Sequence, residues 1–197
     1  MTGVDDLALA SLHHLHDRGL DDVMVVGSSL GGWIAAEMAV RDTAGLITGL
    51  VLLDAVGAHV PAEPIADVFS LGPRDLAALS WHDPAPVLAA AADLTPGQAE
   101  LRLADMATMR ALAGDPCMHD PKLLRRLGRV RTPALLLWGE SDRIVTPAYG
   151  AAYARAFGNG RFEVIAGAGH LPQLEQPDAT CALIEEHLRR TGTRVPR

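Results

Sequence analysis

The sequence predicts an α/β fold with a mostly parallel sheet, because apolar runs of strand length alternate with helical patterns along the chain. Four such runs stand at residues 23–26, 50–53, 134–138 and 162–166. With 197 residues, 49% of them hydrophobic, the chain can bury a sizeable core. Its length is that of one domain with an insertion.

The first element is predicted to be a helix that precedes every strand-like run. Asp5 and Asp6 stand where acidic side chains favour a helix N-terminus, and Gly19 stands near the expected end. Leucines recur at helical spacing and are expected to share one face of this helix: Leu7, Leu9, Leu12 and Leu15.

The second element is a strand that turns sharply into a helix. Gly-Ser-Ser-Leu-Gly at residues 27–31 is a Gly-x-Ser-x-Gly pattern, and a helical pattern follows at 34–39. A side chain at such a turn is forced outward, so Ser29 is the candidate nucleophile. The backbone N–H of Leu30 stands at the positive end of the helix and is a candidate oxyanion donor.

The bare pattern is weak evidence in a chain with 19 glycines. The succession of strand, turn and helix makes it more specific. Gly27 and Gly31 are both expected to permit a close crossing of the strand and the helix, since neither carries a Cβ atom.

Two later segments supply candidate partners for the serine. Asp142 follows the apolar run at 134–138, and His170 follows the run at 162–166 in a Gly-Ala-Gly-His loop. A carboxylate beyond a strand end can orient a histidine, and the histidine can take the serine proton as a general base.

The orienting acid has alternatives. Asp54 ends the strand-like run at 50–53 near the candidate nucleophile, so it is a second candidate for the same role. Glu140 lies closer to the exit of its strand and is a weaker competitor. Sequence order favours Asp142.

Residues 60–128 are predicted to form an all-helical insertion between two strand units. The segment is rich in Ala, Leu and Pro, and helix signals are present over 95–114 and 120–128. Such an insertion can exclude water and shape a pocket. Four side chains are candidate pocket residues, although each type also commonly packs in a core: Phe69, Trp81, Met106 and Met109.

Two further helices are predicted, one before the last strand and one after it. Thr146 and Pro147 give a cap and a first turn to a helix that reaches Gly158. The final helix spans 177–190, and the arginines at its end favour its dipole.

Together these motifs resemble the α/β-hydrolase family. The resemblance is carried by Gly-Ser-Ser-Leu-Gly-Gly at 27–32, Leu-Val-Leu-Leu-Asp-Ala at 50–55, Trp-Gly-Glu-Ser-Asp-Arg-Ile-Val-Thr-Pro at 138–147 and Gly-Ala-Gly-His at 167–170. The order Ser, Asp, His is that of this fold. The resemblance implies a core of residues 1–59 and 129–197 with a helical lid at 60–128.

The resemblance also implies strands before the first strand seen here, and a His-Gly-like turn that supplies a second oxyanion N–H. The residues before Val23 contain neither pattern. We therefore expect the C-terminal portion of an α/β-hydrolase fold, with the elbow strand at an exposed sheet edge. That edge is expected to pair with a second copy or with a missing N-terminal segment.

Composition bounds the partners. The formal net charge of −7 argues against nucleic acid or an anionic membrane surface as a partner, and we expect no basic run that would offset this charge. No stretch has the length of a membrane span, and no signal peptide is recognisable. Cys117 and Cys181 match neither a disulfide framework nor a metal pattern, which favours a cytoplasmic protein. Four other histidines are expected to be unpartnered and solvent-facing: His59, His82, His119 and His187.

The expected function is hydrolysis of a carboxylic ester or similar small acyl substrate through an acyl-enzyme on Ser29. This chemistry requires no metal and no organic cofactor. Hydrolysis of a carbon–carbon bond by the same fold is an alternative, and a non-catalytic remnant that acts as a binding protein is another. An aspartate nucleophile, which the resemblance implies for related dehalogenases and epoxide hydrolases, is disfavoured because Ser29 occupies the elbow.

Overall fold

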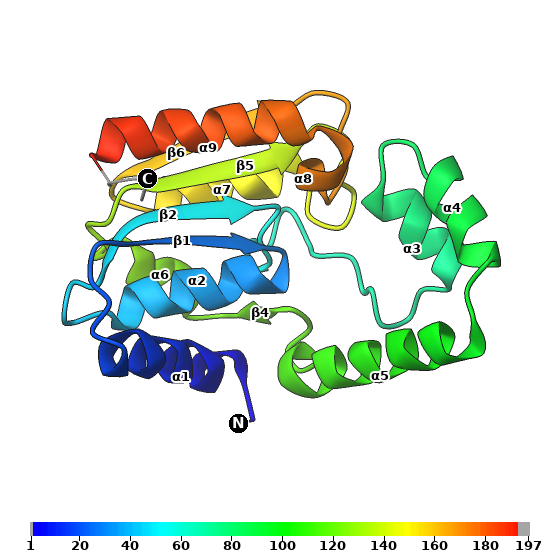
Figure 1. The fold of residues 1–197 in the computed structure, drawn as a ribbon, viewed down its shortest axis with the longest axis horizontal. Helices are drawn as coiled ribbons and strands as arrows, with labels where there is room; N and C mark the ends of the chain where they lie inside the picture. Colours follow the sequence, from blue (N-terminus) through cyan, green and yellow to red (C-terminus); the bar gives the residue numbers. More distant parts are fainter. Residues whose placement is uncertain (1, 193–197) are drawn as a thin grey trace.

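The computed structural model describes residues 2–192 and is built around a four-stranded parallel sheet (Figure 1). The strand order is β1-β2-β5-β6, and each neighbouring pair is parallel. The predicted α/β class with a mostly parallel sheet is confirmed. The four strands are β1 (Val23–Ser28), β2 (Ile47–Leu53), β5 (Ala134–Gly139) and β6 (Gly160–Ile165).

Helices cover both faces of this sheet. On one face lie α2 (Leu30–Arg41), α7 (Pro147–Ala156) and the short α6 (Leu123–Leu127), and on the other lies α9 (Pro177–Thr191). Leu52 and Leu136 point into the cluster with α2 and α7, whereas Leu53 and Leu137 point into the cluster with α9. Strands buried on both faces read as continuous apolar runs, which is the pattern that identified them. No helix within residues 2–192 is long and apolar enough to cross a membrane.

The first helix, α1 (Val4–Asp17), packs against α2 and not directly on the sheet. Its buried residues are Val4, Ala8 and Leu12, one turn apart, while Leu9 is 43% exposed. The expected all-leucine face was therefore wrong. The buried stripe is set by the i, i+4, i+8 positions, and small Ala8 lies at its centre because the two helices approach closely.

Strand β1 lies at the edge of the sheet, as the sequence predicted. Within the described residues it pairs only with β2, and Val26 in its middle is 50% exposed. An unpaired strand edge presents free backbone donors and acceptors. Its pairing with a second copy or a further segment stays a prediction.

Most of the segment predicted as an insertion lies beyond the carboxyl ends of the strands, whereas its last residues run back alongside α2 (Figure 1). It contains α3 (Pro73–Ser80), α4 (Ala85–Ala92) and α5 (Pro96–Ala113). It is not all helical, because β4 (His119–Asp120) pairs in parallel with β3 (Gly57–Ala58) and ties the segment to the core. Leu123 and Leu127 of α6 are fully buried in the core cluster, so the last part of residues 60–128 packs with the core.

Two glycines permit close approaches of α2, Gly27 to strand β1 and Gly32 to the residues after β2, and they are not the expected pair. A Cβ atom on Gly27 would overlap the backbone of Gly31, and one on Gly32 would overlap Ala55. A Cβ atom on Gly31 would meet nothing within 4 Å. The expectation for Gly31 was wrong, since its α-carbon faces open space on the helix surface.

This contrast gives a matched pair of variants. Gly27→Ala is predicted to lower the free energy of unfolding by about 1–3 kcal/mol, because the new methyl group meets rigid backbone. Gly31→Ala is predicted to be neutral or stabilising by up to about 1 kcal/mol, because alanine favours a helix over glycine. Urea unfolding of both variants measures the difference, and equal effects would contradict the crossing geometry.

Candidate active site

Three loops at the carboxyl ends of the strands bring together the side chains that the sequence singled out. Ser29 follows β1, Asp142 follows β5, and His170 follows β6. Because all four strands are parallel, these loops leave the sheet at the same edge, where ligand sites of α/β sheets form.

The backbone of Ser29 is held in an unusual conformation, with φ 53° and ψ −117°. L-residues rarely adopt this region, and such strain persists only where the surrounding structure enforces it. The close crossing at Gly27 and Gly32 enforces it here. Leu30 is the first residue of α2, so its N–H has no partner within the helix and remains near the serine as a donor.

The imidazole of His170 lies between the serine and a carboxylate. Its Nε2 atom is 2.8 Å from Ser29 Oγ, and its Nδ1 atom is 2.8 Å from Asp142 Oδ2. His170 is 8% exposed and Asp142 is 2% exposed. Hydrogen bonds shielded from water in this way are stronger and better oriented than exposed ones.

Asp142 is itself fixed by the turn that follows β5. Its Oδ1 atom accepts hydrogen bonds from the N–H groups of Ile144 at 2.8 Å and Val145 at 3.2 Å. This leaves Oδ2 for His170. A carboxylate that accepts two backbone hydrogen bonds cannot rotate freely, so the turn sets the direction of the bond to the histidine.

Asp54, the alternative acid, lies beside this pair but makes a different contact. Its Oδ1 atom accepts from Gly139 N–H at 2.9 Å, while its buried Oδ2 has no hydrogen-bond partner among the described residues. Burial raises the pKa of the Asp54 carboxyl well above its ordinary value, and the charge of Asp142 raises it further. Asp54 therefore holds its proton to a higher pH than an exposed aspartate does.

Atoms of Asp54, Asp142 and His170 that could ligate a metal lie within 4.8 Å of one another, and all three residues are buried. Both ring nitrogens of His170 are engaged, one by Ser29 and one by Asp142. A cation would have to displace one of these hydrogen bonds. The 2.8 Å distance between His170 Nε2 and Ser29 Oγ is one across which a proton can pass.

The family follows from comparison with known proteins. The sequence matches the model described as "Alpha/beta hydrolase family" over residues 2–183. The chain belongs to the alpha/beta hydrolase family. Membership makes it an α/β-fold hydrolase, as the resemblance of its motifs predicted.

Individual relatives of this hydrolase are similar at modest identity. It is 28% identical to epoxide hydrolase EphH of Mycobacterium tuberculosis over 203 residues, which cover 86% of this chain and 87% of that protein. A meta-cleavage product hydrolase (CumD) from Pseudomonas fluorescens matches with a TM-score of 0.75 at 18% identity, covering 96% of this chain and 73% of that one. A thermophilic esterase matches with a TM-score of 0.70 at 20% identity, covering 98% and 75%. These structural likenesses show the fold.

In this hydrolase the histidine loop is braced by a glutamate that no pattern in the sequence singles out. The carboxylate of Glu175, at the end of α8 (Pro172–Glu175), accepts from Gly169 N–H at 2.6 Å. It also accepts from the N–H groups of His82 at 3.0 Å and Asp83 at 3.3 Å. One side chain therefore joins the residue before His170 to the loop after α3.

The last residues of α3 and the loop after it make further contacts with the two candidate site loops. His170 N–H donates to Ser80 O at 2.6 Å, and Arg143 N–H donates to Leu79 O at 3.1 Å. The His82 ring bonds Ser141 Oγ at 2.8 Å. The inserted segment thus holds both the acid loop and the histidine loop in place.

Of the four other histidines, His59 and His82 are solvent-exposed as expected, but neither they nor His119 is unpartnered. His82 bonds Ser141, and the rings of His59 and His119 stack with centroids 4.7 Å apart. His187 is only 4% exposed, because it lies on the inner side of α9, and burial lowers its pKa. Single histidines on a sequence give no signal of such contacts, since the partners come from other elements.

The four candidate pocket residues are partly buried and fall into different surroundings. Arg110 lies over the ring of Phe69 at 5.2 Å, and Met109 packs against the core cluster. Trp81 lines a hollow of about 360 Å³ with Glu175 of the histidine loop. Met106 lies three residues before Met109 on α5. The hollows lined by Phe69 and Trp81 do not include Ser29, so contact of these residues with substrate stays a prediction.

The raised pKa of Asp54 predicts a pH dependence of stability. The folded protein holds this proton more tightly than the unfolded chain, so the Asp54 contribution to the free energy of unfolding falls as pH rises from about 4 to the raised pKa. Asp54→Asn keeps an acceptor for Gly139 N–H and removes the titration. The variant should therefore gain stability relative to the unaltered protein as pH rises.

Urea unfolding of both proteins at several pH values between about 4 and about 8 measures this difference. Parallel stability curves for the two proteins would contradict a protonated Asp54 in the folded state.

Proposed function

We propose that the chain is a serine hydrolase that cleaves a carboxylic ester or a similar small acyl substrate. The observation that carries the proposal is the continuous pair of 2.8 Å hydrogen bonds from Ser29 through His170 to Asp142. A serine hydroxyl is a weak nucleophile unless a positioned base removes its proton, and this geometry supplies such a base.

In the proposed reaction, His170 Nε2 takes the proton of Ser29 as the serine oxygen attacks the carbonyl carbon. The N–H of Leu30 then stabilises the negative oxygen of the tetrahedral intermediate. His170 returns the proton to the departing alcohol, which leaves an acyl group on Ser29. Water attacks this acyl-enzyme with His170 again as base, and the acid is released.

Asp142 is proposed to orient the imidazole and to stabilise its protonated form. Its hydrogen bond to Nδ1 selects the tautomer whose Nε2 can accept the serine proton. Asp54 is proposed to support Asp142 as a neutral neighbour, because a second charged carboxylate at this position would repel the first.

We propose that the part of residues 60–128 that precedes α6 acts as a lid, since Leu123 and Leu127 of α6 are buried in the core cluster. Support comes from the hydrogen bonds of Ser80, Leu79 and His82 to the loops that carry His170 and Asp142. A segment attached to these loops can exclude water from the serine.

Two other reactions of hydrolase relatives bear on the proposal. Opening an epoxide by an enzyme carboxylate at the elbow would require an acid where this chain has Ser29, although a relative is named an epoxide hydrolase. Hydrolysis of a carbon–carbon bond is a second candidate, favoured by the Gly-x-Ser-x-Gly-Gly motif together with a helical insertion. Short-chain p-nitrophenyl esters and a β-diketone-like acid, compared by kcat/KM, distinguish it from ester hydrolysis.

The role of Ser29 is tested by labelling the purified chain with a fluorophosphonate. Labelling is predicted on Ser29 alone, because among residues 2–192 its hydroxyl is the one that bonds the His170 ring. Ser28→Ala is a matched control one residue away, since Gln173 Nε2 donates to its hydroxyl at 3.2 Å. Ser28→Ala should label normally and Ser29→Ala should not.

Mass spectrometry of the labelled peptide locates the adduct. A folded sample that takes no label would overturn the proposal in favour of a non-catalytic binding protein of this fold.

The two buried acids are separated by matched amide variants. Asp142→Asn is predicted to lower kcat for an ester about 10⁴-fold, because it favours the wrong tautomer of the histidine. Asp54→Asn is predicted to change kcat less than about tenfold, because the bond to His170 Nδ1 comes from Asp142 and the amide keeps an acceptor for Gly139 N–H. Circular dichroism checks that both variants fold, and the reverse order of effects would assign the orienting role to Asp54.

A further inference from the structure

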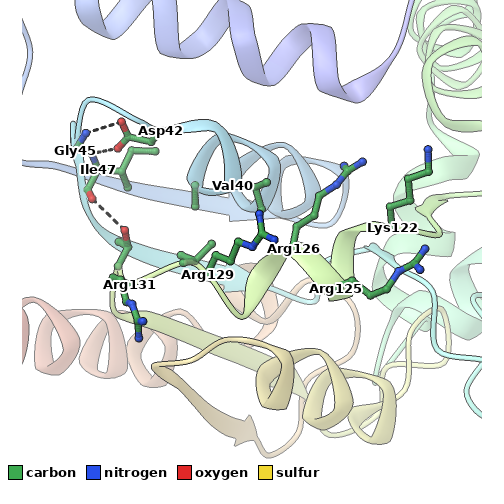
Figure 2. Close-up of a pocket in the computed structure, with 12 residues that line it drawn as sticks. Val40, Asp42, Gly45, Ile47, Lys122, Arg125, Arg126, Arg129 and Arg131 are labelled. Carbon is green, nitrogen blue, oxygen red and sulfur yellow. Dashed lines mark hydrogen bonds between the residues drawn. The ribbon is translucent and has the colours of Figure 1, made fainter.

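A groove at the amino ends of the strands, the end opposite Ser29, carries a concentration of positive charge (Figure 2). It has a volume of about 720 Å³, within the range of small-molecule sites. It lies where Ile47 begins β2 and Thr132 precedes β5, at the amino ends of the strands. Because β5 has six residues at about 3.3 Å each, the groove is about 20 Å from the loops of the candidate active site.

Five basic side chains line this groove: Lys122, Arg125, Arg126, Arg129 and Arg131. They fall within ten consecutive residues of a chain whose net charge is −7, and no acidic residue follows Asp120 until Glu140. The expectation that the chain has no basic run was wrong for this segment. Leucines and a glycine are interspersed with the charges in the sequence. The structure adds that the five basic side chains line one groove.

The charges lie on α6 and directly beside it. Arg125 and Arg126 belong to α6, Lys122 stands directly before it, and Arg129 lies in the turn after it, where its N–H donates to Arg126 O at 3.2 Å. Leu123, Leu127 and Val130 of the same segment are buried in the core. The packing of these apolar residues therefore fixes the direction in which the cations point.

Few acidic groups balance this charge. Arg126 Nη1 is 2.8 Å from Asp120 and 3.8 Å from Glu37. The other four basic side chains have no ion pair within residues 2–192. Like charges this close together repel one another and destabilise a helix. An exposed helix face without a ligand more often mixes both signs.

The remainder of the lining is apolar apart from one acid and one hydroxyl. Val40 and Ile47 form part of the floor, and Asp42 is the acidic residue. Both carboxylate oxygens of Asp42 are occupied, because they accept from Gly45 N–H and Ile47 N–H at 2.8 Å each. Figure 2 shows Arg126 and Arg129 extending toward the α2 side of the groove, whereas Arg131 points away from them.

We propose that this groove binds the adjacent phosphate groups of a small diphosphate. Guanidinium groups match phosphate oxygens in geometry as well as in charge. A ligand with several negative charges would relieve the repulsion among Lys122, Arg125 and Arg129, more fully than a monocarboxylate with its single charge can. A long polyanion is disfavoured because the surrounding surface of a chain with a net charge of −7 repels it. The site is independent of the proposed ester hydrolysis.

Isothermal titration of the whole chain with inorganic pyrophosphate, at low ionic strength, tests this site. The double variant R125Q/R129Q is predicted to bind about 100-fold more weakly, about tenfold for each charge-assisted hydrogen bond that the substitutions remove. R74Q/R102Q is the matched control, because both residues are exposed, unpaired within the described chain and outside the groove. The control should bind within about twofold of the unaltered protein.

The groove variant also has a readout that does not depend on a ligand. Without pyrophosphate, R125Q/R129Q should unfold at the same temperature as the unaltered protein or higher, because repulsion is removed. Titration with ADP identifies the source of the phosphates: tighter binding than pyrophosphate assigns an organic diphosphate that uses the apolar floor, and equal binding assigns the inorganic ion.

Three results would overturn the proposal. These are no heat of binding with pyrophosphate, equal weakening in the two double variants, and binding of acetate as tight as that of pyrophosphate. A short DNA duplex that binds through Arg125 and Arg129 while pyrophosphate does not would replace the proposal with a nucleic-acid site.

Discussion

The imidazole of His170 depends on two hydrogen bonds that must exist together, and much of the structure serves to keep both. The bond to Ser29 Oγ requires the strained turn after β1, and the bond to Asp142 Oδ2 requires the turn after β5. Each turn is held by its own contacts, at Gly27 for the first and at Ile144 for the second. The parallel sheet brings both turns to the carboxyl ends of the strands, so the two turns need no contact with each other.

The second constraint is the placement of two carboxyl groups in one buried space. Asp54 and Asp142 are both almost fully buried, and two neighbouring charges there would be costly. The raised pKa of Asp54 lessens this conflict, because a carboxyl that keeps its proton to higher pH adds no second charge over that range. The hydrogen bonds differ in the same sense: Asp142 accepts two backbone N–H bonds through one oxygen, whereas Asp54 accepts one.

The strands and the three candidate site residues were predictable because their signals are local. An apolar run, a glycine-flanked serine and a Gly-Ala-Gly-His loop each lie within a few consecutive residues. Glu175 was not predictable, because its three hydrogen bonds join residues that are distant in sequence, from His82 to Gly169. The same reason explains strand β4, whose two residues pair with a segment about sixty positions earlier.

The most direct measurement of the central arrangement is the proton NMR spectrum of the Nδ1–H group of His170. A proton shared with a buried carboxylate is protected from exchange and resonates far downfield. We predict one such signal that disappears in both His170→Gln and Asp142→Asn and persists in Asp54→Asn. A signal that persists in Asp142→Asn, or that disappears in Asp54→Asn alone, would contradict the assigned hydrogen bond.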